Sequence, residues 1–150
     1  MSEELVVRLR LLPHYQGLPI PAYQSEQAAG MDLLAAIEED VLLSAGSFSL
    51  IPAGIAIELP EGYEAQVRPR SGLAAKNGIG LLNSPGTIDA DYRGEIKVII
   101  FNFSKEDFTI TRGMRIAQLV VAPVVRYQWQ VVDALSDSER GAGGFGHTGN

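Results

Sequence analysis

Residues 54–69 read GIAIELPEGYEAQVRP, and apolar and polar side chains alternate on both sides of the Pro-Glu-Gly break at 60–62. In the first half, Ile55, Ile57 and Leu59 share one face of an extended chain. In the second half, positions 63, 65 and 67 oppose the polar positions 64, 66 and 68. Successive side chains of a strand point to opposite faces, so this stretch predicts two half-buried strands joined by a turn.

The same short alternation recurs along the chain between Gly, Pro and Asn breaks, with further strands expected at 5–10, 31–35, 48–51, 96–101 and 116–121. Residues 98–101 are apolar at every position, which is typical of a strand covered on both faces. One short helix is expected over SGLAAKNG, with Ser71 as N-cap and Gly78 as the stop. Many short strands with frequent turns indicate an all-β sandwich, jelly roll or barrel.

Composition limits the classes of protein that the chain can represent. Its 150 residues suit one domain, and the absence of Cys excludes disulfides and thiolate metal sites. A net charge of −6 argues against a partner that is duplex DNA or an anionic membrane. The N-terminal residues lack a basic region before their apolar stretch, so we expect a cytoplasmic location. Composition turns polar and Gly-rich near the C-terminus, which predicts a β domain over 1–134 and a mobile arm over 135–150.

Two segments carry charged side chains at unusual places, the first inside an expected strand and the second at the end of one. In AGMDLLAA (29–36), Asp32 interrupts an apolar run and should have a partner, unless it simply faces solvent. In RPRSGLAAKNG (68–78), Arg70 and Ser71 stand where a strand gives way to a helix, whose N-terminus attracts phosphate. Ordinary capping by Ser71 beside a surface Arg explains the second segment equally well.

Two later segments are equally rich in polar groups. In LLNSPGTIDADYRGE (81–95), a turn at Asn83 precedes Asp89 and Asp91, which share a side in strand geometry and could divide into a base and a partner of Arg93. An acidic hairpin end is the alternative. In TRGMRIAQLVV (111–121), Gln118 interrupts an apolar strand and needs hydrogen-bond partners, as a structural bridge or as a ligand group.

The last eleven residues, RGAGGFGHTGN, contain five Gly together with Arg140, Phe145 and Thr148. Bare glycine backbone can approach a phosphate closely, an Arg adds a planar fork for its oxygens, and an aromatic ring can stack on a base. A disordered tail is the alternative that composition alone favours.

Taken in order, these five segments resemble the five motifs of the homotrimeric dUTPase family, from residue 29 to the C-terminus. The resemblance implies a jelly-roll-like subunit, a homotrimer and active sites built from three chains, with the first, second and fourth motifs from one chain, the third motif from another and the arm from the last. It implies hydrolysis of dUTP to dUMP and pyrophosphate with Mg²⁺, which keeps uracil out of DNA and supplies dUMP for thymidylate synthesis.

The resemblance also implies roles for individual residues. Asp89 is the general base, Asp32 holds water on Mg²⁺, Tyr92 packs on the deoxyribose, and Asn83 reads uracil. The full expected substrate-binding set is Arg70, Ser71, Gly72, Asn83, Gly86, Ile88, Asp89, Tyr92, Lys97, Gln118, Arg140, Gly144, Phe145, Gly146, His147 and Thr148.

Two positions depart from the family pattern, namely His147, where Ser is usual, and Met31, where an aromatic residue is common. His147 could replace the hydroxyl as a donor to phosphate. Two alternatives stay open: a dCTP deaminase of related fold, against which the run Asp89–Tyr92 argues, and a non-catalytic nucleotide-binding regulator, against which Asp89 and the complete arm argue.

Overall fold

The computed structural model describes residues 4–146, 148 and 149. Within these residues the chain forms eleven strands, one α-helix and one 3₁₀ turn. In chain order they are β1 (Arg8–Leu11), η1 (Pro13–Tyr15), β2 (Met31–Leu34), β3 (Val41–Leu43), β4 (Phe48–Pro52), β5 (Ile55–Glu58), β6 (Tyr63–Arg68), α1 (Ser71–Asn77), β7 (Ile79–Leu81), β8 (Gly86–Ile88), β9 (Lys97–Asn102), β10 (Phe108–Ile110) and β11 (Arg115–Pro123).

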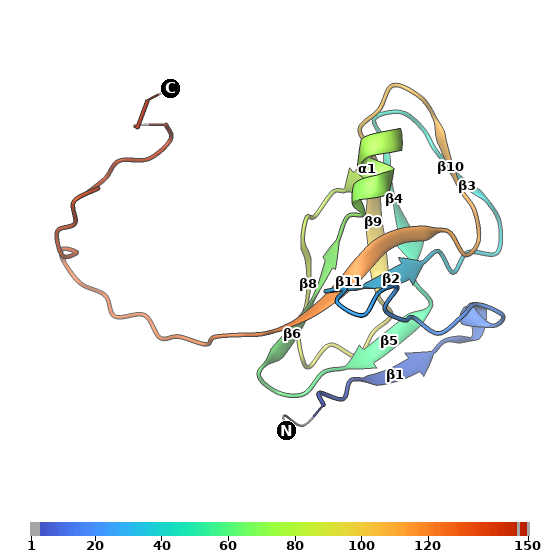
Figure 1. Ribbon diagram of the computed structural model, residues 1–150, viewed down its shortest axis with the longest axis horizontal. Coiled ribbons are helices and arrows are strands. Elements are labelled where there is room, and N and C mark those ends of the chain that lie inside the picture. The colour runs from blue at the N-terminus through green and yellow to red at the C-terminus, as the bar shows by residue number, and fades with distance from the viewer. Residues whose placement is uncertain (1–3, 147, 150) are drawn as a thin grey trace.

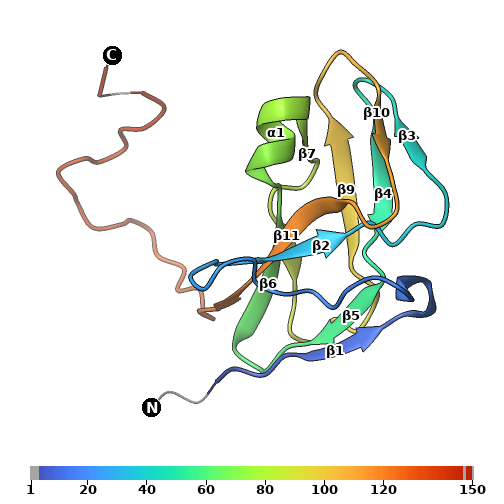
Figure 2. The ribbon, with the colours of Figure 1, turned by 45° about the vertical axis from the view of Figure 1, so that its right-hand side comes forward.

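The strands pair antiparallel in four small sheets, ordered β2-β11-β6-β8, β4-β9-β7, β1-β5 and β10-β3. Neighbours in a sheet are mostly distant in sequence, since the late strand β11 lies between β2 and β6. Figures 1 and 2 show the sheets folded around one interior, with α1 beside β7 at one end of the body. The all-β, jelly-roll-like fold class with one short helix is thus confirmed.

The opening stretch forms β5 and β6 as expected, and Ile55, Ile57, Ala65 and Val67 are buried. The first strand differs from its prediction, because β1 starts at Arg8 and all four of its residues are exposed. In β9 only alternate positions are fully buried, so one of its faces is half-covered in the single chain. No helix in the described part of the chain is long and apolar enough to cross a membrane.

One polar side chain, Asn102, is completely buried and fully hydrogen-bonded. Its amide nitrogen donates to the carbonyls of Leu43 and Glu106 at 3.0 and 2.7 Å, and its oxygen accepts from the Ser104 amide and hydroxyl at 3.0 and 2.7 Å. Asn102 therefore ties β9 to β3 and to the loop before β10.

The helix starts differently from the sequence prediction. Its N-cap is Arg70 in extended conformation, with no side-chain capping bond, and Ser71 is the first helical residue. The prediction that Ser71 caps the helix was wrong, because the chain turns one residue earlier. Gly78 ends the helix as expected, with a left-handed φ of 65° and its N–H bonded to the carbonyls of Leu73 and Ala74.

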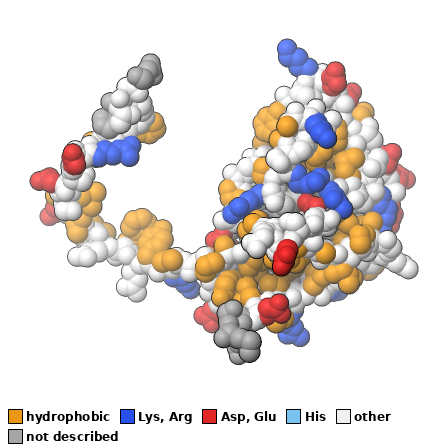
Figure 3. Space-filling view, in the orientation of Figure 1, with side chains coloured by type: hydrophobic (Ala, Val, Ile, Leu, Met, Phe, Trp, Pro, Cys, Tyr) orange, Lys and Arg blue, Asp and Glu red, His pale blue; other side chains and the backbone are white. Residues whose placement is uncertain are grey.

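The chain leaves the β body just after β11. Val124 still donates to the carbonyl of Gly62 at 2.9 Å, and the segment beyond it runs away from the body to the C-terminus (Figure 1). Large apolar side chains along this segment are exposed: Val125, Tyr127, Trp129, Val131 and Leu135 are 71 to 96% accessible. Figure 3 shows them as apolar surface standing clear of the body.

Candidate active site

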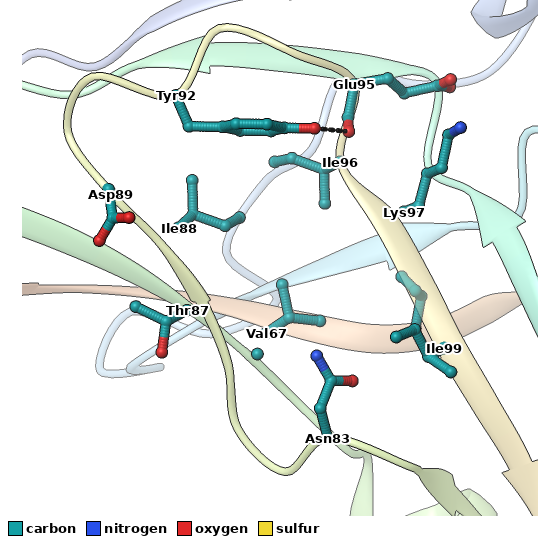
Figure 4. Close-up of a pocket in the computed structure, with 12 residues that line it drawn as sticks. Val67, Asn83, Thr87, Ile88, Asp89, Tyr92, Glu95, Ile96, Lys97 and Ile99 are labelled. Carbon is teal, nitrogen blue, oxygen red and sulfur yellow. Dashed lines mark hydrogen bonds between the residues drawn. The ribbon is translucent and has the colours of Figure 1, made fainter.

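A cavity of about 270 Å³ opens beside β8, β9 and the turns that flank β8 (Figure 4). Six residues that the sequence predicts for substrate binding line it: Asn83, Gly86, Ile88, Asp89, Tyr92 and Lys97. The other lining residues are Val67, Thr87, Glu95, Ile96, Val98 and Ile99. The structure thus brings the expected base-reading, pentose and general-base residues to one place.

The floor of the cavity is set by the turn between β7 and β8. The Leu82 amide donates to the carbonyl of Ile99 at 3.0 Å, and the Ser84 hydroxyl donates to that of Leu81 at 2.8 Å. Gly86 is buried, and a Cβ there would lie 3.2 Å from Nδ2 of Asn83. Because Gly86 has no side chain, the Asn83 amide can turn into the cavity (Figure 4). There it offers a hydrogen-bond donor and an acceptor to the polar edge of a planar ligand.

Asp89 and Tyr92 lie in the turn after β8. The Tyr92 amide donates to the carbonyl of Asp89 at 3.1 Å, and the Tyr92 hydroxyl donates to the carbonyl of Glu95 at 2.9 Å. In Figure 4 the Tyr92 ring lies across one end of the cavity, next to Ile96, Asn83 lies at the opposite end, and the Asp89 carboxylate stands at one side.

Two details of this segment correct the sequence interpretation. The strand β8 ends at Ile88, so Asp89 and Asp91 belong to a turn and are not alternate residues of one strand. The ion pair of Arg93 is with Glu58, at 3.3 Å, because the turn directs its side chain toward β5, and its other bonds go to the carbonyls of Ala90 and Tyr92.

A second polar cluster surrounds Asp32 on β2. Its Oδ1 lies 3.1 Å from Nε of Arg70, and its Oδ2 lies 3.8 Å from Nε of Arg115, with the carboxylate side chain 17% exposed. Asp32 therefore has the partner that its place in an apolar strand requires. Figure 3 shows Lys and Arg side chains gathered on this face of the body around a small acidic patch.

Gln118 of β11 lies opposite Asp32 in register, and its Nε2 donates to the carbonyl of Pro69 at 3.0 Å. Arg70 also donates to the carbonyl of Arg115 at 3.1 Å. Ser71 follows at the start of α1. A Cβ added at Gly72, the next residue, would meet no atom within 4 Å, so the helix start is open on that side.

The C-terminal arm does not reach either cluster in the single chain. Nε of Arg140 donates to the carbonyl of Gly143 at 2.6 Å, and the Phe145 ring is fully exposed. Gly144, Gly146 and Thr148 lie in the same segment, far from the body in Figure 1. The expected site residue His147 lies outside the described residues.

The described residues contain no group of three His, Cys, Asp or Glu side chains that could hold a metal ion directly. Asp32 offers one carboxylate whose two oxygens each face an arginine. A carboxylate has about four acceptor directions, so lone pairs remain for a water molecule. The donor set therefore fits a metal ion held through water on an anionic substrate, which is how Mg²⁺ binds in many nucleotide sites.

Sequence reasoning gave no role to Glu95 or Arg115, which the structure places beside Tyr92 and Asp32. Both stand inside the segments quoted for other residues. Arg115 lies on the same strand as Gln118, which could have marked it as a site residue. The sequence did not show that this strand pairs with β2, which carries Asp32. Nothing in sequence marks Glu95, whose contacts lie 41 and 81 residues away.

The site has two parts. The cavity, with the Asn83 amide inside it and the Asp89 carboxylate at its edge, is suited to a base and a pentose, and the separate arginine cluster is suited to phosphates. These are the parts of a nucleotide. A model of the dUTPase family matches residues 16–149. The chain therefore belongs to the dUTPase family, and its activity is dUTP hydrolysis. The resemblance found in the sequence is confirmed.

Solved structures agree with this assignment. The dUTPase of Staphylococcus bacteriophage 80alpha with dUPNHPP is 28% identical, with a TM-score of 0.85 over 97% of this chain and 99% of that chain. A glycine-to-serine mutant of the same phage enzyme with dUpNHpp is 26% identical, with a TM-score of 0.85 over the same shares. A mutant dUTPase from phage phi11 of S. aureus, described with a structural Mg(II) ion, is 24% identical, with a TM-score of 0.77 over 88% and 99%, and supports the fold.

Proposed function

We propose that the chain hydrolyses dUTP by in-line attack of water on the α-phosphorus. The water oxygen forms a bond to phosphorus, its proton passes to the Asp89 carboxylate, and the bond to the leaving pyrophosphate breaks to give dUMP. Asp89 supports this role because it lines the cavity, is exposed at its edge and forms no ion pair among the described residues. A general base needs an ionised group with room for a water molecule.

The cavity is the proposed site for uracil and deoxyribose. Asn83 would read the base edge with its amide, beside the backbone of Gly86 and the apolar wall of Ile88. Tyr92 would lie against the pentose and leave no room for a 2′-hydroxyl. Lys97, whose side chain rises at the far side of the cavity in Figure 4, would face the substrate's negative charge.

The second cluster is the proposed phosphate site. Arg70, Ser71, Gly72 and Gln118 stand together at the start of α1 and the middle of β11. Phosphoryl transfer requires positioning and charge neutralisation more than covalent help from the protein. The ion pair of Asp32 with Arg70 aligns the guanidinium before substrate binds.

When bound to the triphosphate, Mg²⁺ supplies further charge neutralisation and orients the phosphates. Asp32 would hold one of its water ligands. A mutant dUTPase of phage phi11 is described with a structural Mg(II) ion, so Mg²⁺ occurs in a protein of this fold.

We propose the homotrimer that the family resemblance implies, and two uncovered apolar surfaces support association of subunits. The first is the outer face of β4-β9-β7, where Phe48 pairs with Phe101 and Leu50 with Ile99, and where both leucine and phenylalanine of β4 are more than half exposed. The second is the apolar side of residues 125–135. Contiguous exposed apolar side chains often mark interaction sites, and a closed homo-oligomer would cover both surfaces.

We assign the arm to residues 135–150, after a β domain of 1–134 whose last residues, beyond β11, already stand off the β body of the single chain. The arm would close over the site of another subunit. Arg140 and the glycine backbone would clamp the terminal phosphate, with Gly144, Gly146 and Thr148 contributing donors, and Phe145 would stack on uracil. Closure would exclude all water except the nucleophile. His147 would add a donor in place of the family's usual hydroxyl.

The observation that carries the proposal is the meeting of Asn83, Asp89 and Tyr92 at one cavity. Its test uses purified protein with Mg²⁺ and follows pyrophosphate release from dUTP, dCTP and UTP. We expect dUTP alone to be turned over efficiently, since a site built for one donor–acceptor pattern leaves groups unpaired with another. Comparable turnover of all three nucleotides would reject the assigned roles of Asn83 and Tyr92, and a uracil nucleotide formed from dCTP would favour a deaminase.

A further inference from the structure

Glu95 connects the Tyr92 turn to the protein body in two ways. Its backbone carbonyl accepts the hydrogen bond from the Tyr92 hydroxyl at 2.9 Å (Figure 4). Its side chain extends away from the cavity, where Oε2 accepts from the Gly54 amide at 3.0 Å and contacts Nε2 of His14. The carboxylate is 18% exposed, so these contacts are largely shielded from water.

His14 is itself held firmly by the turn η1. The Leu12 amide donates to the carbonyl of Gly54 at 2.9 Å, and the neighbouring Tyr15 is 2% exposed in the core. Arg112 donates to the carbonyls of His14 and Gln16 at 3.0 and 2.7 Å. The imidazole therefore reaches Glu95 from a fixed point of the body.

Apart from its hydrogen bond to Glu95, the Tyr92 ring rests against Gly94 and lies next to Ile96 (Figure 4). It is 46% exposed, and its hydroxyl donates to the Glu95 carbonyl. The nearby pair of Arg93 with Glu58 is 53% and 41% exposed, and ion pairs in that setting contribute little rigidity. The orientation of the ring therefore depends on the Glu95–Ile96 peptide. The amide of this peptide donates to the Ile55 carbonyl at 2.9 Å, and the Glu95 side chain adds its contacts with Gly54 and His14.

We propose that His14 is a positioning residue for sugar selection. Through Glu95 it fixes the Tyr92 hydroxyl and so keeps the ring where it excludes a 2′-hydroxyl. This inference rests on the proposed packing of Tyr92 against the deoxyribose. It assigns a role in specificity to the segment before β2, which lies outside all five motifs.

The test measures kcat/KM for dUTP and for UTP with His14→Ala. We expect the preference for dUTP to fall about threefold to tenfold, the usual effect of losing one hydrogen bond. His14→Gln places a donor nitrogen at a similar reach and should restore the preference. His14→Phe keeps the ring volume without its nitrogens and gives the same test if the Ala variant does not fold.

Tyr15→Phe is the matched control, because it removes the bond from the Tyr15 hydroxyl to the Pro19 carbonyl in the same turn and leaves His14 in place. It should lower Tm without changing the preference. In a Tyr92→Phe background, His14→Ala should have no further effect on the preference.

The proposal is overturned if the His14→Ala enzyme folds and its preference for dUTP over UTP stays within about twofold of wild type, because the loss of one hydrogen bond has a larger effect. An equal change in Tyr15→Phe also overturns it. If wild-type enzyme itself fails to prefer dUTP, the assigned role of Tyr92 fails first. The link from His14 is then tested separately by NMR of ¹³C-labelled tyrosine rings, where His14→Ala should shift the Tyr92 signal and an unchanged signal refutes the link.

Discussion

Gly94 is the residue whose replacement should uncouple substrate choice from stability. A Cβ at this position would lie 2.5 Å from the hydroxyl oxygen of Tyr92 and 2.7 Å from its Cζ. Carbon atoms in contact prefer separations of about 3.5–4.0 Å, so Gly94→Ala leaves the ring about 1 Å too close. Gly94 is not among the glycines with positive φ, so the backbone accepts Ala and the ring must move.

The expected change in stability is small. Losing the bond from the Tyr92 hydroxyl to the Glu95 carbonyl costs about 1 kcal/mol. Replacing Gly by Ala at a permitted backbone conformation returns about 0.4–1 kcal/mol by restricting the unfolded chain. The free energy of unfolding should therefore change by no more than about 1 kcal/mol, which corresponds to a Tm shift of about 2–4 °C in a chain of this size.

The expected change in substrate choice is larger. A displacement of about 1 Å at a reacting or positioning group can cost up to about 10² in rate, so kcat/KM for dUTP should fall. The space released beside the pentose should raise the relative use of UTP by about tenfold or more, as for other changes of one methyl-sized volume. The assay is kcat/KM for both nucleotides, followed by pyrophosphate release, with Tm measured alongside.

Gly46→Ala is the control, because Gly46 has a φ of +75° and an added Cβ would meet nothing within 4 Å. It should cost about 1–2 kcal/mol of stability through its left-handed backbone and leave substrate choice unchanged. The reasoning is refuted if Gly94→Ala keeps the wild-type preference for dUTP, or if both variants lose it equally.

Three further predictions concern other parts of the chain. Asp89→Asn should lower kcat by about 10²–10⁴ with little change in dUTP binding, and more than about a tenth of wild-type turnover would show that Asp89 is not the base. Asn102→Ala removes four hydrogen bonds of a fully buried side chain and should lower the free energy of unfolding in urea by about 3–5 kcal/mol, whereas a loss under about 1 kcal/mol would show that these bonds stabilise the fold little. A chain cut after Ala134 should fold and trimerise but hydrolyse dUTP poorly. Mixed trimers of this truncated chain and the full-length Asp89→Asn chain should be more active than either parent. Proven mixed trimers without such recovery would reject a site shared between chains.

Alternation along the chain was enough to predict most strands and the fold class. The period-two pattern around the break at 60–62 predicts β5 and β6. In β6 only alternate residues are buried, as expected, whereas in β5 Ala56 is buried as well, because β5 is covered on both faces. Gly78 predicts the end of α1 because a left-handed residue is needed there. Local chemistry also indicated that Asp32 requires a partner, which follows from the cost of an unpaired carboxylate in an apolar strand.

Other features depend on contacts between distant residues and could not be read from local pattern. The partners of Asp32 come from the end of β6 and the start of β11, and those of Glu95 from η1 and the turn before β5. The predicted cap of α1 was wrong because the helix start depends on where the backbone turns, and the predicted partner of Arg93 was wrong because a turn directs its side chain toward β5. Sequence alone determined most of the strands and the motifs, since these depend on neighbouring residues, but it missed the three-residue strands β3, β7, β8 and β10, which are too short to show an alternation of their own. Asn83, Asp89 and Tyr92 belong to one short segment, 83–92, and strand pairing set Val67 of β6 and Lys97 of β9 beside them to complete the cavity. Contacts between distant residues also tie Tyr92 through Glu95 to His14, because antiparallel register and packing fix which distant side chains meet.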